Sequence, residues 1–219
     1  MLGLLVWGCS SGGGTNPSNN LQPLTSPTFA GPTPKTTNGD TAIGVLAAQL
    51  DAASLNVVFQ DYLEFFSGQG TQNGNTWTWI KQSSTLTATA DLTVNGSNYT
   101  LSLTFNGTYE NQNYGDAIVM SGTESSDGKN GSWSIATPAG DGELDWSTDS
   151  HGTLTGTFTS TDSDNEKDIL TNKADGSGEF QEYNGSAVKL DVTWSSNGSG
   201  QWVAYDPTTG NQIGSGSWS

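Results

Sequence analysis

The side chains that could perform chemistry in this chain are one histidine, one cysteine and twenty-two carboxylates. The histidine, His151, follows Asp149 and Ser150, so the residue types of a catalytic triad stand side by side. A triad needs a nucleophile, a base and a carboxylate in convergent geometry, which neighbours on one turn seldom reach. We therefore expect His151 to be a solvated turn residue. One histidine and one cysteine also make a poor ligand set for a transition metal.

The carboxylates offer two further hypotheses. Alternating acidic residues in the segment STDSDNEKD could converge on one calcium ion, which takes several oxygen ligands from one loop. These residues are Asp162, Asp164, Glu166 and Asp168. A solvated acidic loop is the simpler interpretation, because the segment lacks the glycine that turns an EF-hand loop. No other cofactor is expected.

A glycoside hydrolase needs only two carboxyl groups at a suitable separation. Five glutamates lie in or near the expected strands, and no spacing selects a pair among them: Glu110, Glu124, Glu143, Glu179 and Glu182. A surface hydrolase therefore stays open as an alternative function.

The first residues, MLGLLVWGCSS, are an apolar run that ends in Gly8, Cys9 and serine. The run is too short to span a bilayer, which takes about 20 residues, so a signal-peptide core is the better interpretation. The segment VWGC resembles the lipobox of bacterial lipoproteins. That resemblance implies a lipid anchor on Cys9 and, with Ser10 and Ser11 after it, a place in the outer membrane of the cell envelope. The side of that membrane is left open.

Charge and composition limit the partners. The chain has 22 acidic and 6 basic residues and a formal net charge of −16. All the basic residues are lysines, so no guanidinium fork is present to hold phosphate. An acidic surface repels the phosphate backbone that dominates nucleic-acid affinity, which excludes nucleic acid as a partner.

The chain divides into three parts. Residues 1–8 are interpreted as a signal-peptide remnant, and residues 9–40 as the lipidated cysteine and a flexible linker rich in Ser, Gly, Pro, Asn and Thr. Residues 41–219 are expected to form one β-rich domain. Its only helical segment is 41–66, where apolar residues recur every three or four positions and Gly44 and Ser54–Asn56 are points at which it could divide.

From 76 to 218 apolar residues alternate with Thr and Ser between frequent Asn-Gly and Asp-Gly dipeptides. These dipeptides are the strongest hairpin signal, because the turns that join twisted strands need positive φ. We expect about ten or eleven strands in an antiparallel meander that forms a barrel or a strongly curled sheet. Most of the tryptophans are expected in its core.

A repeat of about 48 residues aligns Asp127-Gly128 and Trp146 with Asp175-Gly176 and Trp194. This pattern resembles β-rich envelope lipoproteins of bacteria, and the resemblance implies no activity. The sequence thus favours a membrane-anchored, non-enzymatic binding or structural domain. Its partners would be the membrane, through the anchor, and a glycan, a lipid or an envelope protein.

Overall fold

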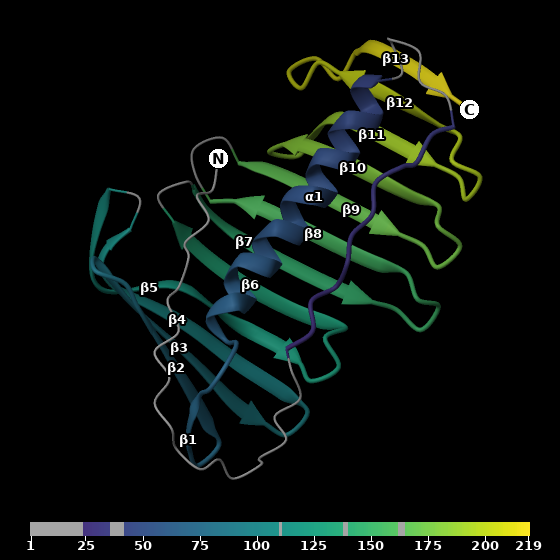
Figure 1. Cartoon of the computed structure of the whole chain (residues 1–219). Coiled ribbons are helices and arrows are strands. Elements are labelled where there is room, and N and C mark those ends of the chain that lie inside the picture. Colours follow the sequence, from purple (N-terminus) through teal and green to yellow (C-terminus); the bar gives the residue numbers. More distant parts are fainter. Residues whose placement is uncertain (1–23, 36–41, 110, 138–139, 162–164) are drawn as a thin grey trace.

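The computed structural model describes residues 24–35, 42–109, 111–137, 140–161 and 165–219. In this part of the chain one helix precedes thirteen strands. Figure 1 shows the strands as one curved layer, with helix α1 lying diagonally across one of its faces. The expected mainly β, antiparallel architecture with one helix is confirmed.

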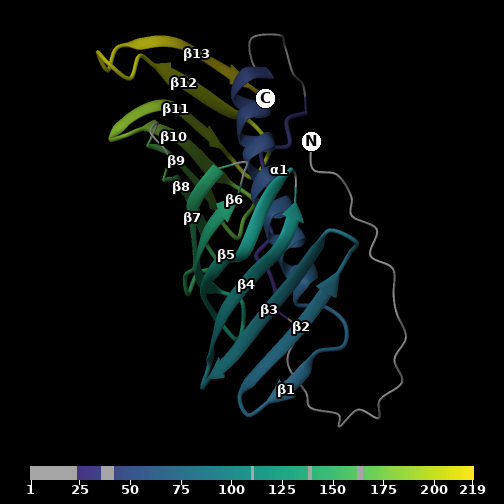
Figure 2. The same ribbon diagram turned by 90° about the vertical axis from the view of Figure 1, so that its left-hand side faces the viewer.

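The thirteen strands form a single meander. Each strand pairs with its neighbours in sequence, so the order across the sheet runs from β1 to β13. No pairing joins β1 to β13 among the described residues, and the layer curls around the helix when seen along its edge (Figure 2). The strands are β1 (Thr71–Asn73), β2 (Thr76–Gln82), β3 (Leu86–Asn95), β4 (Asn98–Tyr109), β5 (Gln112–Ser125), β6 (Asn130–Thr137), β7 (Gly140–Thr148), β8 (Leu154–Ser160), β9 (Glu166–Asn172), β10 (Gly178–Asn184), β11 (Ala187–Trp194), β12 (Gly200–Tyr205) and β13 (Gln212–Trp218).

Helix α1 (Ala42–Phe65) is continuous and does not divide at Gly44 or at Ser54–Asn56. Its inner face is buried at positions three and four residues apart, which is the spacing of one side of a helix. These residues are Val45, Ala48, Ala52, Leu55 and Phe59. Gly44 is kept small because a Cβ there would lie 2.5 Å from the side chain of Trp202. Packing against the sheet therefore outweighs the local cost of glycine in a helix.

Six of the nine Asn-Gly and Asp-Gly dipeptides after residue 66 lie between consecutive strands with glycine at positive φ, as expected. The other three lie inside strands. One of them, Asn106-Gly107, coincides with an irregularity in the β4–β5 pairing, where a Cβ on Gly107 would collide with the backbone of Thr85. Sequence alone did not separate these two uses of the same dipeptide.

More strands are present than the sequence indicated. The alternation of apolar and polar residues is hidden where glycine takes the inward position, as at Gly142 of β7 and Gly214 of β13. In place of a large side chain, each of these positions is filled by an aromatic ring from a neighbouring strand. Phe158 covers Gly142, and Trp202 covers Gly214. A pattern search for apolar residues therefore undercounts such strands.

Three cross-strand pairs of glycine and tryptophan repeat along the sheet. The pairs are Gly131 with Trp146, Gly178 with Trp194, and Gly200 with Trp218. In each pair the indole lies so close to the glycine that a Cβ could not fit. Each indole Nε1 also donates a hydrogen bond to a turn glycine carbonyl, at Gly128, Gly176 and Gly198. The Gly–Trp pairing of the two sequence repeats thus recurs once more at the end of the sheet, with Trp218 only 24 residues after Trp194.

Residues 24–35, here called the cover segment, lie against the helix and the sheet, although their composition indicated a flexible linker. Phe29 is buried and stacks with Phe59 at a ring-centroid distance of 6.3 Å. Asn56 of α1 donates to the Phe29 carbonyl oxygen and accepts from its amide, and Asn172 of β9 does the same with Ala30. The buried Phe29 ring and these two amide pairs hold a segment of low hydrophobicity against the helix and the sheet.

We predict that Gly178→Ala destabilises the domain by about 1–3 kcal/mol, because its Cβ would collide with the Trp194 indole and the Thr171 carbonyl oxygen. The measurement is chemical unfolding. Gly115→Ala is the control, since nothing lies within 4 Å of a Cβ built there, and it should change stability by less than about 0.5 kcal/mol. Equal effects of the two substitutions would contradict the packing argument.

Candidate functional site

Several residues singled out from the sequence lie outside the described part of the chain: Cys9, Asp162, Asp164 and Glu110. The remaining two members of the acidic segment are placed. Glu166 and Asp168 lie on β9, two residues apart and therefore on the same face of the strand. Among the described residues, no group of three or more His, Cys, Asp or Glu side chains is arranged to hold a metal ion.

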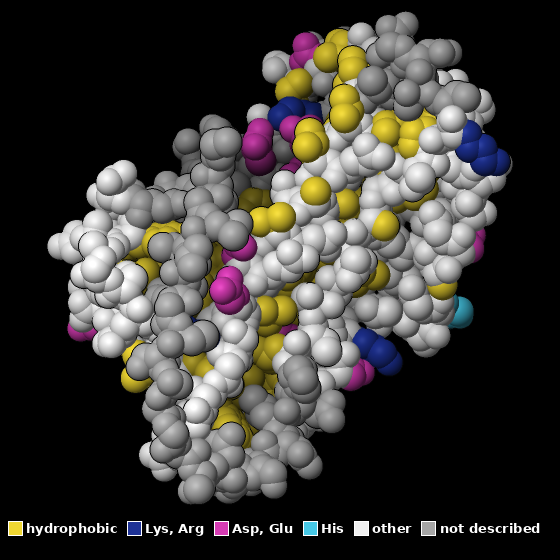
Figure 3. Space-filling view, viewed as in Figure 1, with side chains coloured by type: hydrophobic (Ala, Val, Ile, Leu, Met, Phe, Trp, Pro, Cys, Tyr) yellow, Lys and Arg dark blue, Asp and Glu magenta, His cyan; other side chains and the backbone are white. Residues whose placement is uncertain are grey.

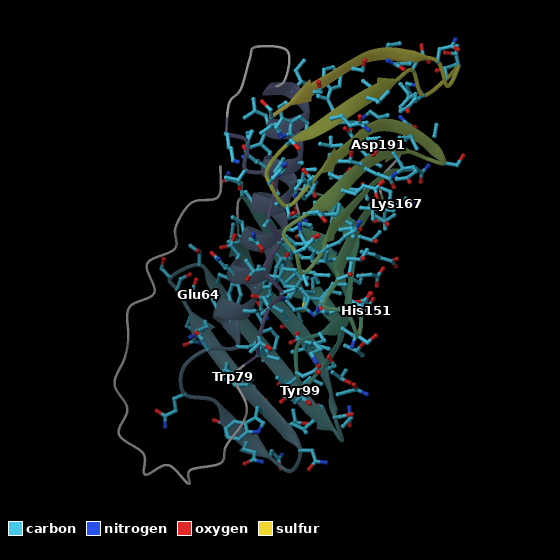
Figure 4. All side chains as sticks on the ribbon, turned by 90° about the vertical axis from the view of Figure 1, so that its right-hand side faces the viewer. Glu64, Trp79, Tyr99, His151, Lys167 and Asp191 are labelled. Atoms are coloured by element: carbon cyan, nitrogen blue, oxygen red, sulfur yellow. The ribbon has the colours of Figure 1, made fainter. Side chains whose placement is uncertain are left out.

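His151 is a turn residue with 87% of its side chain exposed. Figure 4 shows it on the side of the sheet away from α1. Its Nδ1 lies 3.8 Å from Asp149 Oδ2 and 3.5 Å from Ser150 Oγ. In a triad the carboxylate and the nucleophile meet different ring nitrogens. Here both approach the same one, so these neighbours are not arranged as a triad.

The tryptophans form much of the core, as expected. Of the seven tryptophans between residues 76 and 218, six are buried, and Trp77 packs against the core partly exposed. Phe59 of α1 is in the middle of this aromatic packing, with its ring centroid 4.9 Å from those of both Trp133 and Trp146. These indoles are therefore used to hold the helix on the sheet.

Three carboxyl groups meet beneath the helix, and we call them the acidic cluster: Asp51 of α1, Asp168 of β9 and Glu182 of β10. Asp168 and Glu182 are direct cross-strand partners. Burial, followed by the negative charges of Asp168 and Glu182, raises the pKa of Asp51 to about 7. Burial and the charges of Glu182 and Glu166 raise the pKa of Asp168 to about 6, although Lys189 opposes this. Asp51 and Asp168 therefore take up protons near neutral pH.

Lys189 provides the positive charge beside this cluster. The register of β10 and β11 shifts at Glu182, so that Leu190 faces Glu182 and Val188 faces Tyr183. Lys189 lies at this irregularity, and its Nζ donates to Glu182 Oε1 at 2.5 Å and to Glu166 Oε1 at 3.2 Å. The hydrogen bond to Glu182 is the main reason that the pKa of Lys189 is raised. One lysine cannot neutralise all the carboxylates around it, which leaves Asp51 and Asp168 to be neutralised by protons.

Glu124 is a second, isolated buried acid. It lies on β5 between Tyr99 of β4 and Gly131 of β6, and only 2% of its surface is exposed. Neither carboxyl oxygen has a hydrogen-bond partner in the described part of the chain. Burial raises the pKa of Glu124 to about 8, against the opposing effect of the Thr25 backbone. The group is therefore mainly protonated at neutral pH.

The four described glutamates among those considered for a hydrolase are not brought together. Glu124 and Glu182 face the helix from different parts of the sheet, whereas Glu143 and Glu179 alternate with inward residues and lie on the opposite face. Sequence reasoning did not single out Asp51 or Lys189. Asp51 could have been noticed as an acidic residue within a long apolar helical segment. The β-bulge that positions Lys189 is not marked by any sequence pattern.

No family model, curated protein or solved structure matches this chain. What the acidic cluster and Glu124 do must therefore follow from their own geometry. Asp51 Oδ2 and Asp168 Oδ1 are buried without hydrogen-bond partners among the described residues. Groups so enclosed act on the protein's own stability, because each costs free energy when it ionises.

We predict that Glu124→Gln flattens the pH dependence of stability. The folded state holds a proton on Glu124 up to about pH 8, whereas in the unfolded chain its pKa is near the ordinary value of 4.5. The stabilisation is therefore complete below about pH 4.5 and is lost as the pH rises through about 8, by an amount on the order of a few kcal/mol. Chemical unfolding at pH 5 and pH 9 should find the variant more stable than the wild type only at the higher pH.

The matched control for this measurement is Glu143→Gln, because Glu143 is exposed on the opposite face of the sheet. Its pH profile should follow that of the wild type. If Glu124→Gln also follows the wild type, the buried carboxyl is not the source of the dependence.

We also predict that His151→Asn is tolerated. The side chain is solvated, and the backbone amide of residue 151 keeps its 2.8 Å hydrogen bond to Asp149 Oδ1. The free energy of unfolding should change by less than about 0.5 kcal/mol. A thermal melt measures this, and a loss of several degrees would show that the imidazole has a structural role.

Proposed function

We propose that this protein is a lipoprotein of the bacterial cell envelope, held in the outer membrane by acyl chains on Cys9. Support comes from the apolar run before Cys9, the small Gly8 next to it and the lack of any second cysteine for a disulfide. Acyl chains that bury about 0.8 kcal/mol per methylene make such an anchor essentially permanent. The acidic domain itself gains nothing from anionic headgroups, so the anchor would carry the attachment.

We propose further that the anchored domain binds or supports a partner and is not an enzyme. The observation that carries this proposal is the filling of the inner face of the sheet. Helix α1 and the cover segment occupy the side on which a curled sheet would otherwise present its apolar residues to a ligand. Within the acidic cluster, Asp51 Oδ2 and Asp168 Oδ1 are closed to solvent under this cover, whereas the Glu182 side chain stays 30% exposed. A substrate would have to displace the helix to reach those two oxygens.

In this proposal the open sheet and the helix together take the part of a small β-barrel. Side chains fill the interior of such barrels, and the outer surface is left for interaction. The formal charge of −16 disfavours nucleic acid and leaves glycans, lipids and other envelope proteins as partners.

The anchor is tested by metabolic labelling with a palmitate analogue. The gene is expressed in a bacterium with a complete signal peptide placed before Gly8, and the protein is recovered by immunoprecipitation. We expect label on the wild type and none on Cys9→Ser, because lipidation uses the thiol of the only cysteine.

Immunoblotting of both proteins provides the control for equal expression. Wild-type protein that is exported but carries no label, or label that persists in Cys9→Ser, would refute the lipoprotein proposal.

A further inference from the structure

Helix α1 has a second apolar side, which faces away from the sheet. It consists of Ile43, Leu46, Leu50, Ala53 and Val57, which we call the apolar stripe, and these positions follow helical spacing. Its four large members are between 44% and 64% exposed. The other large exposed apolar residues of the described chain, Ile80, Ile118 and Ile213, lie on separate strands. The stripe is therefore the place where exposed apolar side chains gather.

Over residues 43–60 the exposed positions of α1 itself carry no charge, although acidic and lysine side chains lie beside the upper end of the stripe (Figure 3). The other exposed positions of α1 between residues 43 and 60 are Gln49, Ser54 and Gln60. The acid of this region, Asp51, is turned towards the sheet, where it meets Asp168. In a chain with a formal charge of −16, a face of this length without a charge is a distinctive surface. Figure 3 shows the apolar side chains following the diagonal of α1 on the face turned to the viewer.

By length and composition α1 would be apolar enough to cross a membrane. A helix that covers a sheet needs apolar residues on only one side, the side that packs against the sheet. The sheet accounts for the side with Val45, Ala52 and Phe59. No described part of the chain covers the apolar stripe. Exposed apolar patches of this kind mark interaction sites.

We propose that the apolar stripe docks on the surface of the bilayer that holds the acylated Cys9, so that α1 lies along the membrane. This inference rests on the proposed lipid anchor. Residues 10–23 separate Cys9 from the cover segment, and fully extended they reach at most about 50 Å. The cover segment then runs beside α1. The Gln49 side chain donates a hydrogen bond to the Pro32 carbonyl oxygen, and the Phe29 amide donates one to Asn56 Oδ1. The described chain begins at Leu24 and Thr25, which lie on the face of the sheet that α1 covers, against the core and near Glu124. The attachment point of the tether is therefore on the same side of the sheet as the stripe.

A short tether makes weak docking effective. Tethering a second contact to an anchor a few residues away in the chain raises its local concentration, into the millimolar range for short linkers. The stripe then needs only a weak affinity of its own for lipid. The apolar stripe runs along the helix axis. Helices that lie in the membrane plane bury such a face at the boundary between headgroups and acyl chains.

Charge favours a lipid surface over a second copy of the chain. Two copies would bring two domains of formal charge −16 together around a narrow apolar stripe. A zwitterionic bilayer offers apolar contact without that repulsion. Anionic lipid should weaken docking, because the stripe contributes no lysine to offset the acidic surface.

The test uses the full chain with Cys9→Ser, so that no acyl chain contributes to binding. Flotation with phosphatidylcholine vesicles measures the fraction bound. We expect measurable binding, a loss of about tenfold in Leu46→Gln/Leu50→Gln, and weaker binding to an equal mixture with phosphatidylglycerol. The control is Ile80→Thr/Ile213→Thr, which removes two equally exposed apolar residues away from α1 and should leave binding unchanged.

Thermal melts confirm that both double variants fold, and light scattering after gel filtration gives the oligomeric state. The proposal is overturned if the Cys9→Ser protein does not float with vesicles, if both double variants lose binding equally, or if the anionic mixture binds more strongly. A dimer that Leu46→Gln/Leu50→Gln converts to a monomer would assign the stripe to a second copy. Failure of palmitate labelling with successful flotation would instead reject the anchor and leave the docking surface in place.

Discussion

A single layer of strands has no interior until something covers one of its faces, and the rest of this structure depends on how α1 does so. Phe59 is the centre of that contact, with Phe29 on one side and the indoles of Trp133 and Trp146 on the other. Because sheet contacts join only neighbours in sequence, the helix and the cover segment supply the packing between distant parts of the chain. Without them the meander would be a ribbon of hairpins exposed on both faces.

The same covering encloses the acids. Asp51 enters the core region with the helix, and Glu124 lies near Thr25 of the cover segment. If the helix and the cover segment did not pack on the sheet, the carboxyl groups of both residues would be solvated. The raised pKa values of these groups are therefore a result of docking the helix, and their protonation and the closed arrangement favour each other. The fold is in this respect adapted to hold protons in its core at neutral pH, where most surface carboxylates are ionised.

Much of the architecture could be predicted from the sequence, because turn dipeptides and alternating residues report local geometry. The order of the strands followed from them. Two features did not follow. Glycines such as Gly142 and Gly214 conceal strands, since their aromatic partners stand on another strand. The acidic cluster joins Asp51 to Asp168, residues far apart in sequence, and the bulge at Lys189 completes it. Such encounters depend on tertiary packing, which no local pattern encodes.

The length of α1 has a consequence for how the sheet can vary. Twenty-four residues make a helix of about 36 Å, yet it meets β12 at Gly44 and β2 close to Phe66. A flat sheet would need about 48 Å between those two strands, at about 4.8 Å for each step. The sheet must therefore curve for β2 and β12 both to contact the helix, so the length of the helix limits the curvature of the sheet. A duplicated hairpin would add about 10 Å of width. To keep the same contacts, α1 would need about six more residues, or the sheet would need a stronger curvature. The width of the sheet and the length of the helix therefore cannot change independently.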